Sequence, residues 1–203
     1  MKNHLFINGF FYFCNVKNQV EQAYKVIKAG GIILYPSDTI WGIGCDPNNI
    51  AALEKINQLK KRAADKNFIV LVNAERVLNK HVKVIPDVCY DLLDYANKPL
   101  TIIYPKGQYV APAVLGSDGS IAVRMVNETT AFSYQLIQKL GHGLISTSAN
   151  ISNHPYPKSF QDIDEEIKKG VDFIVDPSFE KTNSAPSQII KIGENGEINI
   201  LRK

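Results

Sequence analysis

Residues 30–46 read GGIILYPSDTIWGIGCD, and this stretch decides the fold class. Its glycine pair stops a helix and permits positive φ, and before it apolar side chains recur at helical spacing between residues 20 and 29. After the pair, residues 32–35 form a short apolar run of the kind that builds a buried strand. The stretch therefore predicts a helix, a sharp turn and a strand in succession, as in an α/β fold.

Outward from this stretch, helical and strand patterns alternate along the chain. Asp46-Pro47 predicts an N-cap followed by proline at the first helical position, with an apolar stripe over residues 50–59. Further helices are predicted at 87–95, at 130–140 with Thr129 or Thr130 as the cap, and after Ser159, where Asp162 completes a capping box. Strands are predicted at 68–72, 100–104, 121–126, 144–146, 173–175, 188–192 and 197–201, with a turn at 194–196 between the last two.

Length and composition fit one globular unit. With 203 residues, 45% of them hydrophobic, the chain can bury a full core, so we expect a single α/β (α+β) domain on a twisted mixed sheet. The net charge of +3 is too small for a protein that coats nucleic acid, although a local basic patch could still bind phosphates. Cys14, Cys45 and Cys89 have no disulfide or zinc spacing, which predicts free thiols in a reducing compartment, the cytoplasm.

The N-terminal residues 5–13 are apolar but do not read as a targeting segment. Asn8-Gly9 interrupts them, one basic residue precedes them, and no small-residue cleavage site follows. Asn-Gly between two apolar runs is instead a hairpin signal. No stretch reaches the ~18 to 20 apolar residues that a membrane-spanning helix needs, so we expect no membrane partner.

Two polar clusters follow predicted strands. In residues 35–44, hydroxyls, a carboxylate and two glycines could line a pocket, or Ser37 and Asp38 could bond their own backbone in an ordinary turn. Trp41 is expected in the core. After the strand at 144–146, Ser146, Ser148 and Asn150 would point to one side of an extended chain, although a capped turn explains them equally well.

Basic side chains gather after the helix predicted at 50–59. Lys60, Lys61, Arg62 and Lys66 could neutralise a triphosphate, or they could complement the helix dipole on a solvated face. Taken alone, the cluster fits the second explanation better. Arg124 lies in an apolar strand, where a substrate anion or an internal acid would satisfy its charge.

Several common catalytic motifs are missing from the sequence. It has no Walker A motif, no dinucleotide fingerprint, no G-x-S-x-G elbow and no H-E-x-x-H. His4, His81, His142 and His154 are expected at the surface or in loops, and no side-chain nucleophile or general base is obvious.

Taken together, the order and spacing of five motifs resemble the YrdC family, also called TsaC, of threonylcarbamoyl-AMP synthases. The motifs are Gly30-Gly31, residues 35–46, Lys60-x-Arg62, Ala122-Val123-Arg124 and residues 146–150. The resemblance runs from about residue 18 to the C-terminus. It implies one YrdC-like domain over residues 18–203 with a concave basic surface, preceded by an N-terminal extension over residues 1–17.

The resemblance also implies an activity and its partners. A nucleotidyltransferase of this family joins L-threonine, bicarbonate and ATP, with Mg²⁺ on the phosphates, into threonylcarbamoyl-adenylate and pyrophosphate. A separate transferase complex then passes the threonylcarbamoyl group to an adenosine beside the tRNA anticodon.

Site residues are implied position by position. Nucleotide contacts fall on Lys60, Arg62, Lys66, Ser120, Ser148, Asn150 and Arg202, and threonine contacts on Ser37, Arg124 and Ser187. Lys60 and Arg62 would act catalytically by stabilising pyrophosphate as it leaves, and Arg124 would offer a bidentate fork to the threonine carboxylate.

The sequence departs from the family pattern at three positions. Ala63 stands where many members have proline, Leu71 where some longer members carry a threonine-binding histidine, and Lys158 where some have a hydroxyl residue. The details of threonine binding are therefore open.

Two other functions compete with the synthase. A non-catalytic module that binds double-stranded RNA needs distributed cations, but would have no use for Ser37, Arg124, Ser148 and Asn150 converging on one cavity. Related carbamoyl-adenylate chemistry occurs in hydrogenase maturation proteins, which carry further domains. The synthase is the favoured hypothesis.

Overall fold

The computed structural model describes residues 3–62, 68–180 and 185–203, and for residues 3–14 it describes the backbone alone. The helices are α1 (Asn3–Lys28), α2 (Ile50–Leu59), α3 (Glu75–His81), α4 (Val88–Asp94), α5 (Phe132–Leu140) and α6 (Glu165–Gly170). The strands are β1 (Ile33–Pro36), β2 (Trp41–Gly44), β3 (Ile69–Val72), β4 (Leu100–Tyr104), β5 (Ile121–Met125), β6 (Leu144–Ser148), β7 (Phe173–Ile174), β8 (Gln188–Ile192) and β9 (Ile198–Arg202). Short 3₁₀ turns lie at Pro112–Val114, Phe160–Asp162 and Pro177–Phe179.

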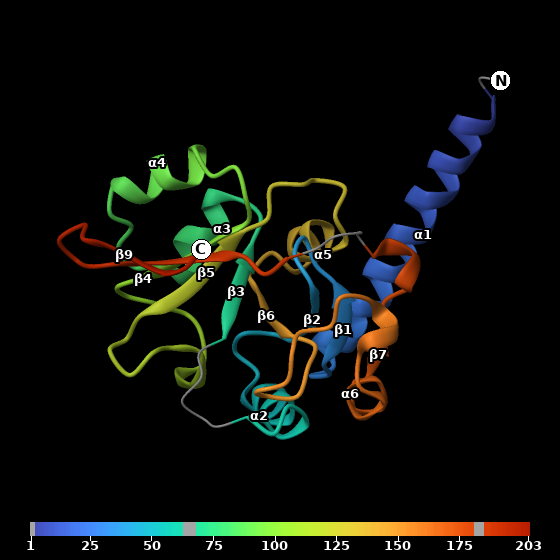
Figure 1. The fold of residues 1–203 in the computed structure, drawn as a ribbon. Helices are drawn as coiled ribbons and strands as arrows, with labels where there is room; N and C mark the ends of the chain where they lie inside the picture. The colour runs from blue at the N-terminus through green and yellow to red at the C-terminus, as the bar shows by residue number, and fades with distance from the viewer. Residues whose placement is uncertain (1–2, 63–67, 181–184) are drawn as a thin grey trace.

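The described strands form one mixed sheet in the order β7-β1-β2-β6-β3-β5-β4-β8-β9 (Figure 1). The pairs β1–β7, β3–β5 and β4–β8 are parallel, and the others are antiparallel. Helices α1 and α5 pack against each other and against β1, while α3 packs against β3. The predicted mixed α/β sheet is confirmed.

Strand β6 joins the two halves of the sheet. Its C-terminal residues Thr147 and Ser148 pair with β2, and its earlier residues, Leu144 to Ser146, pair with β3. A strand shared in this way splays the sheet where its partners change. The polar residues of β6 therefore lie at the junction between the halves.

Strand β2 was missed by the sequence analysis, which took its two glycines for part of a loop. The glycines are needed because β6 approaches β2 closely: a Cβ on Gly44 would lie 2.6 Å from the carbonyl oxygen of Ile145. Tight backbone contact therefore explains the Gly-x-Gly pattern, and Trp41 and Ile43 of this strand are buried. Helix α3 was also missed.

Helix α1 corrects the prediction for the N-terminus. One helix runs from Asn3 to Lys28, so the hairpin predicted at Asn8-Gly9 is wrong, and the predicted domain boundary after residue 17 falls inside the helix. Val16, Val20, Ala23 and Ile27 recur at helical spacing and are all buried. One glycine costs a helix only about 1 kcal/mol, which packing of this stripe offsets. The N-terminal end of α1 extends away from the sheet (Figure 1).

Three predicted caps also shift. Asn49, not Asp46, caps α2, because its side chain accepts a hydrogen bond from the backbone N–H of Ala52. Helix α5 starts after Ala131 without a side-chain cap, so Thr129 and Thr130 do not cap it. The capping box of Ser159 and Asp162 is confirmed, but it closes a 3₁₀ turn that precedes α6.

Three buried side chains bear on the remaining predictions. Cys45 and Cys89 are buried free thiols. His81 is 2% exposed, so its predicted position at the surface is wrong. Within the described ranges, no helix is long and apolar enough to cross a bilayer.

Candidate active site

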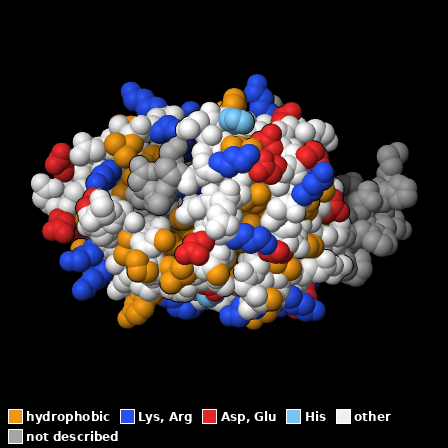
Figure 2. Space-filling view, turned by 90° about the horizontal axis from the view of Figure 1, so that it is seen from below, with side chains coloured by type: hydrophobic (Ala, Val, Ile, Leu, Met, Phe, Trp, Pro, Cys, Tyr) orange, Lys and Arg blue, Asp and Glu red, His pale blue; other side chains and the backbone are white. Residues whose placement is uncertain are grey.

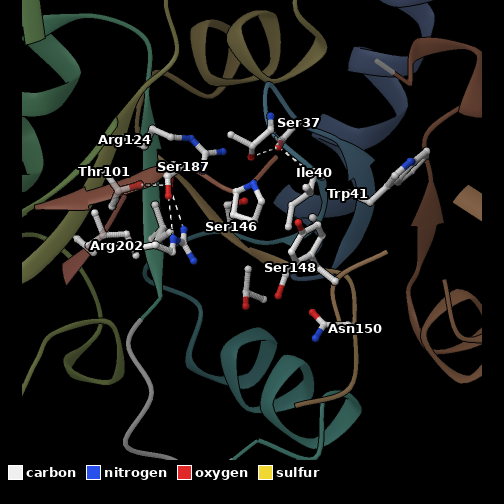
Figure 3. A pocket seen from close by; sticks show the side chains of 18 of the residues that line it. Ser37, Ile40, Trp41, Thr101, Arg124, Ser146, Ser148, Asn150, Ser187 and Arg202 are labelled. Carbon is white, nitrogen blue, oxygen red and sulfur yellow. Dashed lines mark hydrogen bonds between the residues drawn. The ribbon is translucent and has the colours of Figure 1, made fainter. Parts of the chain in front are cut away.

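A cavity of about 370 Å³ opens at the junction between the two halves of the sheet. Apolar side chains of three strands line it: Ile69 at the start of β3, Ile103 of β4 and Ala122 of β5. Its walls come from the turn between β1 and β2, the end of β6 with the segment after it, and the C-terminal strands (Figure 3). The predicted residues that line it are Ser37, Arg124, Ser148, Asn150, Ser187 and Arg202.

Strand register brings the basic wall together. Arg124 on β5 pairs with Thr101 on β4, Thr101 pairs with Ile189 on β8, and Ile189 pairs with Arg202 on β9. Cross-strand partners project from the same face of a sheet, so these four side chains form one row along the cavity. Two guanidinium groups from distant parts of the chain therefore share one wall.

Arg124 is 4% exposed and donates from Nη2 to Asp38 Oδ1 at 2.8 Å. The internal acid considered for this arginine is thus present. The ion pair does not use all the hydrogen-bond donors of the guanidinium, because its Nε is buried without a hydrogen-bond partner among the described residues. Arg124 therefore keeps donor capacity at the cavity.

The turn after β1 is held by its own hydroxyls. Ser37 Oγ donates to the carbonyl of Ile40 at 2.7 Å and lies 2.9 Å from Thr39 Oγ1, while the Thr39 N–H donates back to Ser37 Oγ. Both hydroxyls also line the cavity. The segment is therefore both a turn held by its own hydrogen bonds and a part of the cavity wall, so the two explanations are compatible.

The opposite wall is a second hydroxyl cluster. Thr101 Oγ1 and Ser187 Oγ lie 2.8 Å apart, and Arg202 donates from Nε to the Ser187 carbonyl at 2.8 Å. Partial burial, and then repulsion from Arg124, lower the pKa of Arg202. An anion bound between the two arginines would relieve that repulsion.

Ser146, Ser148 and Asn150 all line the cavity, as the alternating pattern predicted (Figure 3). Asn150 donates from Nδ2 to the carbonyls of Ile151 and His154, which fixes the segment after β6. Its Oδ1 is buried and has no partner among the residues described. An acceptor is therefore available for a ligand donor.

Lys60 lies behind this wall and not in it. It is 3% exposed, and its ammonium donates to the carbonyls of Ser148 and Asn150, the second at 2.6 Å. The carbonyl of Lys60 accepts from the Ser152 N–H at 2.8 Å. The end of α2 thus clamps the segment that carries Ser148 and Asn150.

Two other predicted residues, Arg62 and Ser120, are not among those that line the cavity. Arg62 lies with its guanidinium carbon 4.7 Å from the centre of the Phe68 ring. Ser120 is buried, and its N–H donates to Asp118. Lys66 lies outside the described residues.

The cavity has lining residues that the sequence analysis did not select. Thr39 and Thr101 add hydroxyls, and His154 and Tyr156 line the cavity from the exposed segment after β6. A lone threonine in the apolar run LTIIY was the available signal for Thr101. Trp41 is buried as predicted, and its indole N–H donates to Glu180 at 2.8 Å.

Charges outside the cavity are mixed. On the face seen in Figure 2, Lys and Arg side chains lie among Asp and Glu side chains, without one continuous basic field. Over the described part of the chain, no group of three His, Cys, Asp or Glu side chains could hold a metal ion. The polar side chains that line the cavity include guanidinium, hydroxyl, amide and imidazole groups.

The fold and cavity together define a class of α/β protein that has a cavity with two guanidinium groups at the junction of a mixed sheet. The Sua5/YciO/YrdC family, described as telomere recombination, matches residues 25–203, and the chain belongs to this family.

Relatives of known name support that assignment. A threonylcarbamoyl-AMP synthase of Idiomarina loihiensis is 33% identical over 161 residues, which cover 78% of this chain and 85% of the relative. One of Nitrosococcus oceani is 31% identical over 180 residues, covering 88% and 95%. The Sua5 protein of P. abyssi, solved in complex with L-threonine, superposes with a TM-score of 0.76 at 26% identity over 85% of this chain. The present chain spans about half of that Sua5 chain, 50% of its length.

Proposed function

We propose that this protein is an L-threonylcarbamoyladenylate synthase, a nucleotidyltransferase that makes threonylcarbamoyl-AMP and pyrophosphate from L-threonine, bicarbonate and ATP. One observation carries the proposal: Arg124 and Arg202 share a single cavity with the hydroxyls of Ser37, Thr101 and Ser187. A cavity of that composition suits an amino acid beside a nucleotide. Relatives named threonylcarbamoyl-AMP synthase support the same reading.

Threonine would bind at the wall formed by β5, β4 and β8. Arg124 would bind the carboxylate through the donors that Asp38 leaves available, because a guanidinium matches a carboxylate with two parallel bonds. The hydroxyls of Ser187 and Thr101, 2.8 Å apart, would hold the carboxylate or the side-chain hydroxyl. Ser37 would close the opposite side.

ATP would bind along the end of β6. Ser148 and Asn150 would contact the nucleotide, and Arg202 would neutralise a phosphate. Arg62 and Lys66, just outside the cavity or beyond the described part, would meet the departing pyrophosphate. Mg²⁺ would arrive with the triphosphate, since this ion is commonly held by phosphates and few protein ligands.

The reaction would depend on positioning and charge. The threonine nitrogen forms a carbamate with bicarbonate, a carbamate oxygen attacks the α-phosphorus, and the bond to pyrophosphate breaks. Negative charge then grows on the phosphate oxygens, where fixed guanidinium groups lower the barrier. Catalysis therefore needs the two arginines to be held rigidly.

The product, its use and its location follow from the same proposal. Threonylcarbamoyl-AMP would pass to a transferase complex that modifies tRNA in the cytoplasm. The catalytic unit would be the YrdC-like domain over residues 18–203, with residues 1–17 as an extension. The RNA-binding alternative is not favoured, because the hydroxyls and guanidinium groups of the cavity converge on a small-molecule site.

Pyrophosphate release tests the proposal. Purified protein with ATP, bicarbonate and Mg²⁺ should release pyrophosphate only when L-threonine is present. Arg124→Gln should lower kcat/KM for threonine by about 100-fold, since losing a charged hydrogen-bonded contact costs about 3 kcal/mol. Lys191→Gln, which removes an exposed lysine paired with Asp118, should change it by less than about twofold. Release that does not depend on threonine, or no release by folded protein that binds ATP, would contradict the synthase assignment.

A further inference from the structure

Asp38 lies between two residues that line the cavity, and only one of its two carboxylate oxygens bonds Arg124. Its Oδ1 accepts from Arg124, whereas no described residue bonds its Oδ2, and the side chain is 13% exposed. Its neighbours Ser37 and Thr39 both line the cavity, as does Arg124. The turn that carries Asp38 is held by the Ser37 and Thr39 hydroxyls, so the carboxylate has a defined position.

We propose that Asp38 binds the α-amino group of the amino-acid substrate and accepts its proton when the carbamate forms. This inference rests on the proposed function. An α-amino acid carries a cation and an anion on one carbon, and Arg124 with Asp38 offers the complementary pair of charges 2.8 Å apart. Among the described residues that line the cavity none is acidic, and Asp38, between the lining residues Ser37 and Thr39, would supply the negative charge that the ammonium needs.

The chemistry requires a proton acceptor at this place. The ammonium, bicarbonate and the Asp38 carboxylate become the carbamate, one water and the neutral Asp38 carboxylic acid. A nitrogen–carbon bond forms, one carbon–oxygen bond of bicarbonate breaks, and the leaving oxygen departs as water with a proton from nitrogen. A second nitrogen proton moves to Asp38. A carboxylate in contact with the nitrogen serves both binding and proton transfer.

A purely structural role makes a different prediction. If Asp38 only orients Arg124, its loss disturbs carboxylate binding and affects every ligand that has a carboxylate. If Asp38 binds the amine, its loss affects only ligands that have the amine. (R)-3-hydroxybutyrate separates the two, because it is threonine without the amino group.

Calorimetric titration of L-threonine and (R)-3-hydroxybutyrate tests the inference. Wild-type protein should bind threonine at least 10-fold more tightly than the analogue. Asp38→Asn should weaken threonine at least 10-fold and leave the analogue within about twofold, so that the preference disappears. Glu21→Gln, which removes an exposed acid paired with Lys139 on α5, should preserve the preference.

Asp38→Asn leaves Arg124 buried without its counter-charge, which could destabilise the fold. A second variant therefore tests the role of Asp38 without an unpaired buried charge. The double variant Asp38→Asn/Arg124→Gln removes both charges and should show no preference for the amine, whereas Arg124→Gln alone should retain it. Equal weakening of both ligands by Asp38→Asn, or an unchanged preference, overturns the role of Asp38 and leaves the synthase assignment standing. No binding of threonine to wild-type protein overturns both.

Discussion

Arg124 shows how a buried charge can serve a binding site. A guanidinium that is 4% exposed is stable only with an anion beside it, and Asp38 supplies that anion at 2.8 Å. The same contact leaves Nε without a partner in the described structure. Asp38 therefore holds Arg124 in place, and Arg124 lines the cavity.

His81 is a second buried polar residue, with a structural role. Its Nε2 accepts from the Gly143 N–H at 2.8 Å, at the start of β6. Burial, and then repulsion from His142, lower the pKa of His81 to about 4. The neutral ring therefore belongs to the folded state.

We expect the free energy of unfolding to decrease as the pH is lowered, because of His81. An unfolded histidine titrates near 6.5, so between pH 6.5 and 4 the unfolded state binds a proton that the folded state does not. The contribution is fully present above pH 6.5 and should be lost towards pH 4, about 3 kcal/mol in total. Urea unfolding of wild type and His81→Gln measures it.

The test compares how steeply the free energy of unfolding changes with pH in wild type and His81→Gln, and not their absolute stabilities. His81→Gln should be less stable at pH 7 yet lose about 3 kcal/mol less than wild type between pH 7 and 4. His154→Gln, an exposed control at the cavity, should follow the wild-type slope. Parallel curves for wild type and His81→Gln would show that another group carries the pH dependence.

At the scale of elements, the C-terminal end of α2 and the end of β6 are fastened by one side chain. The Lys60 ammonium donates to the carbonyls of Ser148, the last residue of β6, and Asn150, two residues further on. The Ser148 carbonyl also accepts from the Asn150 N–H at 3.0 Å, so Lys60 holds the chain at the point where it leaves the sheet. Lys60 positions the wall that carries Ser148 and Asn150 and is not among the residues that line the cavity.

Lys60→Met should lower both stability and ATP affinity. Two buried carbonyls lose a charged donor, which should cost about 3 kcal/mol in unfolding free energy. ATP binding should weaken by at least 10-fold, because Ser148 and Asn150 lose their position. Lys61→Met provides a matched control, since Lys61 is exposed and pairs with Glu166 on α6, and should change stability by less than about 1 kcal/mol.

The two readouts separate positioning from direct binding. If Lys60 contacted ATP and played no structural role, Lys60→Met would weaken ATP binding and leave the unfolding free energy within the range of Lys61→Met. Unfolding in urea and ATP titration on the same preparations decide between the two.

At the scale of the molecule, β6 makes one cooperative unit of the two halves of the sheet. Ile145 at its centre is fully buried, pairs with Val70 of β3, and its N–H donates to the carbonyl of Cys45 just after β2. The cavity lies where these halves meet, so its geometry depends on their staying together.

Ile145→Ala should destabilise the whole chain by about 3 kcal/mol, the usual cost of a large-to-small change in a core. Trp41 on β2 is the sole tryptophan, so its fluorescence reports the half of the sheet that contains β2. Far-ultraviolet circular dichroism reports the secondary structure of the whole chain. Both probes should shift together in denaturant. Ile198→Ala on the exposed strand β9 should shift neither by more than about 1 kcal/mol. Separate transitions for the two probes would contradict a single unit.

Local patterns were sufficient for much of this architecture. Strands β4 and β8 have the predicted bounds, and the glycine pair and the serine-rich segment 146–150 lie where the pattern set them. Strand β2 was missed because the close approach of the Ile145 backbone leaves no room for a side chain at Gly44, and Ile145 is remote in sequence. The hairpin at Asn8-Gly9 was wrong because the backbone from Asn3 to Lys28 forms one helix, and a local Asn-Gly signal does not exclude a helix.

The sequence by itself determined the alternation of helices and strands, the order of the polar motifs and the resemblance to a family, because each depends on residues close together in the chain. Tertiary structure alone decided which charges meet. Asp38 reaches Arg124 across 86 positions, and Lys60 reaches Ser148 across 88. Sequence patterns report which side chains need partners, but only the packed sheet brings those partners within bonding distance.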